Sequence, residues 1–388
     1  MAKRLCSLVS AGCSQYGKRD GLSGKEIFNE ALGELFANCE KLDKRDVKAL
    51  YLGQAFESFE HQANTAAGIS NDYGFENIPS VRIDSVSASG GGALRQAVLG
   101  IMSGEFDLVI CGGVEKMTNV STSKALEIIS MAANRPYEQQ NGATLTSLNA
   151  LAARMHMSKF GTSEEDLALV AVKNHKNAFE NPKAYFHKLI SVKEVLESRP
   201  ISTPLKLLDC SPICDGASAL ALCSEEIATK FTDDPIDIIG SAEASDCDFI
   251  FRKDYTSFAA TQIASRKAYS IAETKEMDFA EVHDAFTINE LIACEDLGFC
   301  KKGDGRTMIE KGETELNGRL PVNTSGGLKA KGHPVGSSGT GQAYEVFTQM
   351  RGLASASRQV KDPKVALTHS MGGAGVTAQV HIYKRRNA

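Results

Sequence analysis

The stretch "VSASGGGALRQAVLG", residues 86–100, has the residue types and the order that present one side chain for chemistry. A strand-like lead runs into small residues and glycines, and an apolar helical pattern follows. The first turn of a helix carries unpaired N–H groups and the positive end of the helix dipole, so it favours negative charge. Ser87, at this helix mouth, is a candidate nucleophile. The competing interpretation is a plain helix cap, in which Ser87 accepts a hydrogen bond from the first turn.

Three later segments carry histidine or glycine where an α/β fold places loops: "VHDAFTINEL" (282–291), "NTSGGLKAKGHPVGSSGTGQ" (323–342) and "THSMGGAG" (368–375). His283 and His333 are candidate acids or bases, because imidazole titrates near neutral pH. Each of them, taken singly, is more often a hydrogen-bonded structural histidine. The glycines are equally consistent with ordinary turns.

The elements that must position these loops alternate along the chain. Helical patterns such as "SGKEIFNEALGELFANC" are followed by short β-branched runs such as "VKALYLGQA" and "SVRIDSVSA". This alternation predicts crossover units and an α/β fold with a mostly parallel sheet that is covered by helices.

A looser self-similarity divides the chain into parts. Residues 87–115 and 336–375 share the same order: a small-residue turn, a helix, a linker, an apolar strand and a glycine pair. The period is too long for a solenoid, so we predict two duplicated α/β halves, residues 1–117 and 237–388. Residues 118–236 are richer in charge and helical periodicity, and we predict an inserted helical loop domain there that covers one face of the halves.

Composition limits the classes of function. A net charge of −5 over 388 residues argues against nucleic acid or a polybasic membrane surface as the main partner. We find no membrane-spanning apolar run and no signal-peptide core, so a cytoplasmic protein is expected. The ten scattered cysteines fit reduced, buried thiols. The one close pair, in "CSPIC" at 210–214, has no second ligand pair at a zinc-site spacing, and no metal is expected.

The order and spacing of "SASGG", "HDAF", "NTSGGLKAKGHPVG" and "HSMGGAG" resemble the thiolase superfamily over essentially the whole chain. The resemblance is closest to the archaeal and sterol-carrier-protein-type branch of acetyl-CoA acetyltransferases. It implies a five-layered thiolase fold and a coenzyme A (CoA) thioester as substrate, with no permanently bound cofactor. The CoA nucleotide would lie on the loop domain, where Lys173, Lys176 and Lys183 are either phosphate ligands or solvated charges. The resemblance also implies a homodimer or tetramer, and a small OB-fold partner with a zinc ribbon such as many archaeal relatives have.

Roles carry over from the resemblance position by position. Ser87 occupies the seat of the acylated nucleophile, and His333 the place of the base that takes its proton. His283 would help to hold the thioester oxygen, and the backbone of Gly372 would contribute an oxyanion hole. Ser370 stands where other thiolases keep a second cysteine, and is a candidate acid/base substitute.

Two positions depart from the branch pattern. Ser87 replaces the acylated cysteine, and Ala285 replaces a cysteine within "HDCF". With Ser370 in the C-terminal loop, none of the reactive-loop positions carries a cysteine. A thiol is readily brought to thiolate by a helix terminus and a histidine, whereas a hydroxyl must lose its proton in concert with attack. A thioester that becomes an oxygen ester also reverts slowly. We therefore expect weak thiolysis.

Three explanations of the serine stay open at this point. Ser87 could be an engineered replacement of cysteine. The protein could be a natural CoA-thioester lyase of the aldolase type that uses His283 and His333 without an acyl-enzyme, or a non-catalytic subunit of a complex. Retention of both histidines favours catalysis, because enolate stabilisation needs them. The working hypothesis is a thiolase-type acyl-CoA acyltransferase that makes or cleaves 3-ketoacyl-CoA.

Overall fold

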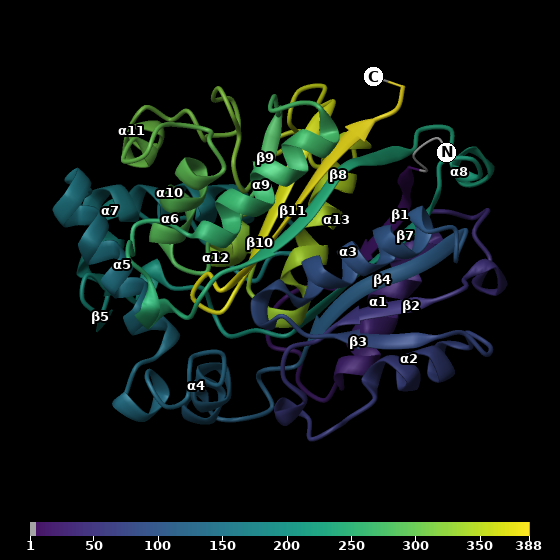
Figure 1. Ribbon diagram of the computed structural model, residues 1–388, viewed down its shortest axis with the longest axis horizontal. Coiled ribbons are helices and arrows are strands. Elements are labelled where there is room, and N and C mark those ends of the chain that lie inside the picture. The colour runs from purple at the N-terminus through teal and green to yellow at the C-terminus, as the bar shows by residue number, and fades with distance from the viewer. Residues whose placement is uncertain (1–4, 388) are drawn as a thin grey trace.

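The computed structural model describes residues 5–387 and consists of a central β-sheet covered by helices (Figure 1). Within these residues the sheet has nine strands, in the order β3-β2-β4-β7-β1-β8-β11-β10-β9. These strands are β1 (Cys6–Cys13), β2 (Leu50–Gly53), β3 (Ser80–Ile83), β4 (Leu108–Glu115), β7 (Gly216–Ser224), β8 (Ile236–Ser245), β9 (Phe279–Glu281), β10 (Val365–Gly372) and β11 (Thr377–Arg385). A separate hairpin consists of β5 (Pro200–Ser202) and β6 (Leu205–Lys206).

The helices of the two halves are α1 (Gly24–Ala37), α2 (Thr65–Tyr73), α3 (Ser89–Met102), α8 (Ala228–Phe231), α9 (Ala259–Ala272), α10 (Thr287–Asp296), α11 (Gly305–Glu310), α12 (Gly327–Ala330) and α13 (Ser338–Met350). No helix in residues 5–387 is long and apolar enough to cross a membrane.

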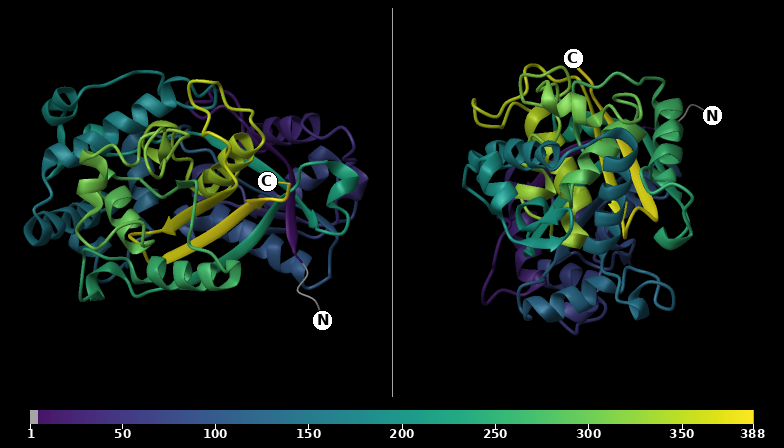
Figure 2. Two further views of the ribbon diagram at one scale, coloured as in Figure 1. Left: turned by 90° about the horizontal axis from the view of Figure 1, so that it is seen from above. Right: turned by 90° about the vertical axis from the view of Figure 1, so that its left-hand side faces the viewer.

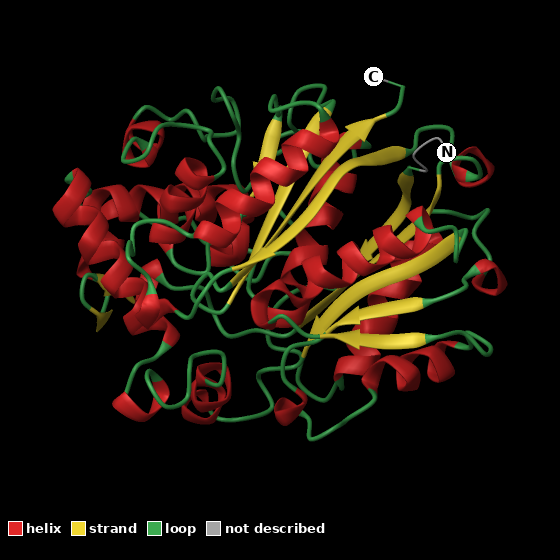
Figure 3. Ribbon diagram, viewed as in Figure 1, coloured by secondary structure: helices red, strands yellow, loops and turns green. Residues whose placement is uncertain are grey.

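Alternation of side chains along the strands places helices on both faces of the sheet. In β4, Val109 and Cys111 join a core with α3 and α13, whereas Leu108 and Ile110 join a core with α1 and α2. In β11, Tyr383 faces the α3 and α13 core, and the residues on the opposite face join a third core with α9 and α10. The two parts of the sheet, β3-β2-β4-β7-β1 and β8-β11-β10-β9, therefore form two layers with α3 and α13 between them and helices on both outer faces. Figure 3 shows the two groups of strands with helices between them. The predicted layered fold of two α/β halves is confirmed.

The direction of the strands corrects the sequence prediction of a mostly parallel sheet. Strand β2 runs parallel to β3 and β4, and β9 runs parallel to β10. The pairs that involve β1, β7, β8 and β11 are antiparallel. Strand β11 follows β10 through a tight turn, which forces antiparallel pairing. Alternation of helices and strands in a sequence does not reveal such returns.

The expected loop domain, 118–236, also contains β7, which lies between β4 and β1 in the central sheet. The segment that leaves the sheet therefore ends before Gly216. Its helices gather at one end of the molecule in Figures 1 and 2. They are α4 (Thr122–Ser130), α5 (Leu145–Phe160), α6 (Glu164–Phe179) and α7 (Val192–Glu197).

Helices α3 and α13, which lie between the two parts of the sheet, approach each other at their N-terminal ends. A Cβ atom on Gly90 would lie 2.8 Å from the carbonyl oxygen of Gly336, and one on Gly339 would lie 2.3 Å from the backbone nitrogen of Gly91. Only glycine permits such a close backbone approach. This contact brings the start of α3, with Ser87, next to the loop that precedes α13, with His333.

Candidate active site

A cavity of about 400 Å³ lies where the two halves meet the insertion, and its wall includes Ser87, His283 and His333. The rest of the wall is mainly apolar, and includes Leu126, Ile129, Leu145, Ile213, Phe286 and Val335. Most small-molecule sites combine apolar walls with a few convergent polar groups. The cavity has this character.

Ser87 lies in the short 3-10 helix η3 (Val86–Ala88), which leads directly into α3. Its side chain is 5% exposed, and its hydroxyl donates to Nε2 of His333 over 3.3 Å. The residue at the N-cap of α3 is Ala88, which makes no side-chain cap, so Ser87 does not act as the cap of α3. Val86 has a φ of 54°, which is a strained value for a β-branched residue. The strained turn is held by Ser89, whose hydroxyl donates to the carbonyl oxygen of Val86 over 2.6 Å.

His333 is held as a proton acceptor toward Ser87. The hydroxyl of Ser338 donates its hydrogen to the carbonyl oxygen of Pro334 over 3.0 Å, so it accepts from Nδ1–H of His333 over 2.6 Å. This bond leaves the Nε2 lone pair of His333 for the Ser87 hydroxyl. Burial lowers the pKa of His333 to about 3, so the imidazole is neutral at physiological pH. The orienting group is a hydroxyl and not the carboxylate of a typical triad.

His283 contributes a second neutral imidazole. Its ring lies 5.4 Å from that of His333, nearly perpendicular to it, and its side chain is 2% exposed. Burial lowers its pKa well below the usual value, and the neighbouring His333 and His369 lower it further. The backbone N–H of Met371 donates to Nδ1 over 3.4 Å. The proton of His283 is therefore on Nε2, which can donate a hydrogen bond to an oxygen in the cavity.

Asp284 partners neither histidine. Its carboxylate accepts from the backbone N–H of Leu328 over 2.6 Å and from Nδ2 of Asn174 over 2.7 Å. Burial raises its pKa, and the adjacent Glu290 raises it further. Asp284 therefore ties the loop of His283 to the first turn of α12.

The C-terminal glycine loop reaches the cavity through Gly373. Gly372 ends β10 directly beside it. Ser370 lies elsewhere: its hydroxyl donates to Oε1 of Gln379 over 3.2 Å, and the residue is not part of the cavity wall. Side chains alternate along β10, so Ser370 and Met371 point to opposite faces of the strand.

The "CSPIC" segment forms part of the cavity wall, which its sequence did not indicate. Cys210, Ser211 and Ile213 line the cavity, and the backbone N–H of Ser211 donates to the carbonyl oxygen of Ala285 over 2.9 Å. Cys214 is fully buried against Gly332, beside the loop of His333. The segment therefore braces both histidine loops. The reactive-loop positions 87, 285 and 370 carry no cysteine, and Cys210 reaches the wall of the cavity from a different segment, beside the loop of His283.

The three lysines considered as phosphate ligands form ion pairs away from the cavity. Buried Lys173 lies 3.0 Å from Glu290, Lys176 lies 2.6 Å from Glu315, and the ammonium of Lys183 lies 2.5 Å from Glu34. Neither alternative predicted for Lys173 holds, since it is neither free for a phosphate nor solvated. The charged residue that does line the cavity is Arg199.

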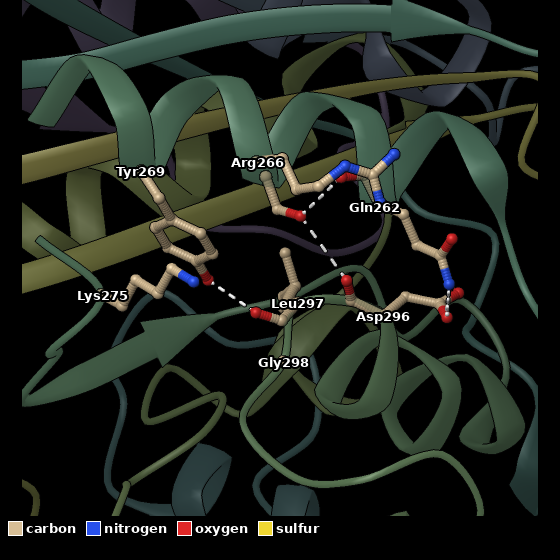
Figure 4. A pocket seen from close by; sticks show the side chains of 8 residues that line it. Gln262, Arg266, Tyr269, Lys275, Asp296, Leu297 and Gly298 are labelled. Atoms are coloured by element: carbon tan, nitrogen blue, oxygen red, sulfur yellow. Dashed lines mark hydrogen bonds between the residues drawn. The ribbon is translucent and has the colours of Figure 1, made fainter. Parts of the chain in front are cut away.

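A second hollow of about 280 Å³ lies between α9 and the end of α10 (Figure 4). Its polar groups bond mainly to one another. Tyr269 donates to the carbonyl oxygen of Leu297 over 2.8 Å, and Gln262 donates to Asp296 over 3.0 Å. This hollow contains no histidine, and its hydrogen bonds fasten α9 to α10.

The layered halves and the Ser87, His283 and His333 cavity define a thiolase-type protein, and comparison with known families agrees. The family "Thiolase, N-terminal domain" matches residues 6–226, and "Thiolase C-terminal domain-like" matches residues 242–385. The chain belongs to the thiolase family.

Curated relatives identify the branch. The chain is 41% identical over 384 residues to "Acetyl-CoA acetyltransferase" of Methanothermobacter thermautotrophicus, covering 98% of this chain and 99% of that protein. It is 39% identical to the protein of the same name in Methanocaldococcus jannaschii, covering 97% and 98%. Human "Sterol carrier protein 2" is 32% identical over 81% of this chain and 60% of that protein. The chain is accordingly an acyltransferase of the thiolase type, as the motifs predicted.

Solved structures agree on the fold. "Ltp2-ChsH2(DUF35) aldolase" matches with a TM-score of 0.85 and 24% identity, over 99% of this chain and 98% of that chain. A human mitochondrial 3-ketoacyl-CoA thiolase in complex with CoA matches with a TM-score of 0.76 and 17% identity, over 98% of each chain.

Proposed function

We propose that the protein transfers acyl groups between CoA thioesters through an ester on Ser87. The observation that carries the proposal is the 3.3 Å contact between the Ser87 hydroxyl and His333, with His333 fixed by Ser338. In this reaction His333 accepts the hydroxyl proton as Ser87 attacks the acyl carbonyl. The hydroxyl bond is broken within the attack and not before it, because a free alkoxide is not accessible.

His283 serves the other half of the reaction. When the bond between C2 and C3 of a 3-ketoacyl-CoA breaks, the electron pair moves onto the thioester and gives an enolate. A neutral imidazole whose Nε2–H donates into a buried cavity stabilises that oxygen, because the water-excluded surroundings strengthen the bond. The backbone amides of Ser87 and Gly372 are proposed to hold the oxygen of the tetrahedral intermediate formed at Ser87.

The test is incubation with acetyl-CoA followed by intact-mass measurement. We expect slow gain of one acetyl group, located at Ser87 by peptide mapping and absent from Ser87→Ala. Ser87→Cys should form the adduct about 10²-fold faster or more, because a thiol is far more easily ionised by a nearby histidine and helix terminus. Acetyl-CoA that binds without labelling either variant would contradict acyl transfer through this position.

A second candidate is a lyase that cleaves the carbon–carbon bond of a 3-hydroxyacyl-CoA without an acyl-enzyme. It is favoured by one feature of the site: two neutral imidazoles line the cavity, and neither is paired with a carboxylate that would strengthen it as a base for serine. Cleavage of a 3-hydroxyacyl-CoA that survives in Ser87→Ala supports this reading. A non-catalytic subunit would give neither adduct nor cleavage, and would require a second chain for stability.

We also propose self-association along strand β3. This strand ends the sheet on one side, and its Val81 is 45% exposed. An uncovered strand edge with an apolar side chain is a pairing surface. Light scattering should give the mass of a dimer or tetramer, and Val81→Lys should shift it toward the monomer. A small OB-fold partner remains part of this proposal by resemblance, and would appear as a second band on purification from the native host.

A further inference from the structure

One thiol lines the cavity. Of the ten cysteines, all within the described residues, Cys210 alone is part of the wall that holds Ser87 and both histidines. Its side chain is partly exposed, and its Sγ–H donates to the carbonyl oxygen of Lys206 over 3.3 Å. The cavity therefore contains an acidic hydrogen that the reaction described above does not use.

Backbone pairing places Cys210 against the loop of His283. Cys210 and Phe286 form an antiparallel bridge, and Ser211 donates to the carbonyl oxygen of Ala285 over 2.9 Å. Ala285 is also part of the cavity wall. The segment that pairs with the loop of Ala285 thus carries a thiol, although residue 285 itself carries no functional group.

His283 gives an independent sign that a substrate oxygen belongs near this thiol. The imidazole is 2% exposed, its Nδ1 is occupied by Met371, and its Nε2–H has no acceptor within residues 5–387. Because His283 lines the cavity, its Nε2–H is available to donate to an oxygen of a bound substrate. Cys210 and His283 line the same cavity, so an enolate oxygen held by His283 would place the adjacent C2 carbon in the cavity that Cys210 also lines.

We propose that Cys210 is the catalytic acid and base for the α-carbon of the CoA thioester. The inference rests on the proposed use of this cavity for CoA thioesters. In cleavage, Ser87 Oγ bonds to C3 and gives its proton to His333, and the C2–C3 bond breaks. The electron pair on C2 then takes the proton of Cys210, which leaves a thiolate and acetyl-CoA.

The return half restores every proton. The thiol of incoming CoA gives its proton to the Cys210 thiolate, and its sulfur attacks the acyl group on Ser87. The Oγ–C bond breaks, and Oγ recovers the proton from His333. The sum is 3-ketoacyl-CoA plus CoA giving acyl-CoA plus acetyl-CoA, with no oxidant or reductant.

The protonation state of Cys210 suits an acid for carbon. Burial raises the pKa of the thiol to about 12, and the adjacent Asp209 contributes to the increase. The resting residue is therefore the thiol, with a proton ready for an enolate. In the reverse direction the rare thiolate is a strong base, so its activity should rise with pH.

The test is exchange of the methyl hydrogens of acetyl-CoA for deuterium in D₂O, followed by mass spectrometry. This exchange needs Cys210 and His283 but no acyl-enzyme, so it reports on the step at the α-carbon alone. We expect wild-type exchange to rise with pH, and both Cys210→Ala and Cys210→Ser to reduce it by about 10²-fold or more, the usual contribution of a general acid or base. Cys247→Ala, which changes an exposed cysteine outside the cavity wall, is the matched control.

Binding of acetyl-CoA, measured by calorimetry on the same variants, separates the possible failures. If the wild type does not bind acetyl-CoA, the proposed function itself is wrong. If it binds, then absent wild-type exchange, or exchange at the wild-type rate in Cys210→Ala, overturns the role of Cys210 alone. Wild-type exchange in Cys210→Ser also overturns it, because the serine would then have replaced a merely structural thiol.

Discussion

Removal of the Ser338 hydroxyl should impair His333 as a base without removing a contact to the substrate. In Ser338→Ala, Nδ1–H of His333 loses its acceptor at 2.6 Å, and the residue is too buried for water to replace the hydroxyl freely. The imidazole can then carry its proton on Nε2, which faces residue 87. In this tautomer Nε2 cannot accept the proton of the nucleophile. The carbonyl oxygen of Pro334 keeps the backbone N–H of Ser337 as a donor, so the loop retains one of its bonds.

The size of the effect follows from the bond that is lost. When residue 87 transfers its proton, His333 becomes an imidazolium, and its bond to Ser338 becomes a bond to a charged group worth about 1.5–3 kcal/mol. At about 1.36 kcal/mol per factor of ten, the loss corresponds to about 10- to 150-fold in rate. The unreacted complex contains a neutral imidazole, so the affinity for acetyl-CoA should hardly change.

The assay compares acetylation rates in the Ser87→Cys background, where the reaction is fast enough for rapid-mixing mass spectrometry. Ser87→Cys/Ser338→Ala should be slower than Ser87→Cys by the stated factor, and Ser87→Cys/Ser338→Thr should recover most of the rate because threonine retains a hydroxyl. Equal rates in the alanine and parent proteins would refute the assignment of Ser338. Equal loss in the alanine and threonine variants would refute it as well, since the cause would then be packing.

Three further outcomes follow from the structure. Because burial lowers the pKa of His333 to about 3, a plot of the Ser87 acylation rate against pH should show no inflection near the ordinary histidine pKa of about 6.5. An inflection at that pH that disappears in His333→Gln would contradict a buried neutral base. Gly90→Ala should lower the free energy of unfolding by about 1–3 kcal/mol in urea titrations, because its methyl group would lie 2.8 Å from the carbonyl oxygen of Gly336. The control Gly33→Ala, in α1 with open space around the added methyl group, should be neutral or stabilising. Burial raises the pKa of Glu115 to about 8, above its unfolded value of about 4.3, so its stabilising contribution is present at acid pH and is lost as the pH rises through about 8. The Tm difference between wild type and Glu115→Gln should therefore shrink from about pH 5 to about pH 9. A difference that grows with pH would show that the carboxylate is stabilised when charged.

Local signals in the sequence were enough for the fold class and for the candidate loops. The glycine-rich start of α3 and the repeated pattern before α13 specify two similar units, because helix and strand periodicities are read over a few residues. The segments around His283 and His333 could be selected for the same reason. Their alignment with Ser87 required more: 246 positions separate Ser87 from His333, and the contact exists because glycines let α3 and α13 approach closely.

The sequence could not give the features that depend on which distant segments become neighbours. The sequence of strand β7 is an ordinary apolar run that does not show where the strand pairs. In the structure it lies in the central sheet, antiparallel to β1 and β4. Lys173 belongs to a charged helical pattern, yet tertiary packing buries it against Glu290.

Cys210 shows the same division most clearly. The sequence shows that residue 210 carries a thiol and that residue 285, on the neighbouring loop, does not. Only the folded chain decides that a bridge to Phe286 puts this thiol in the wall of the cavity. Side-chain identity is a property of one position, whereas reactivity depends on burial and on partners that come from distant parts of the polypeptide.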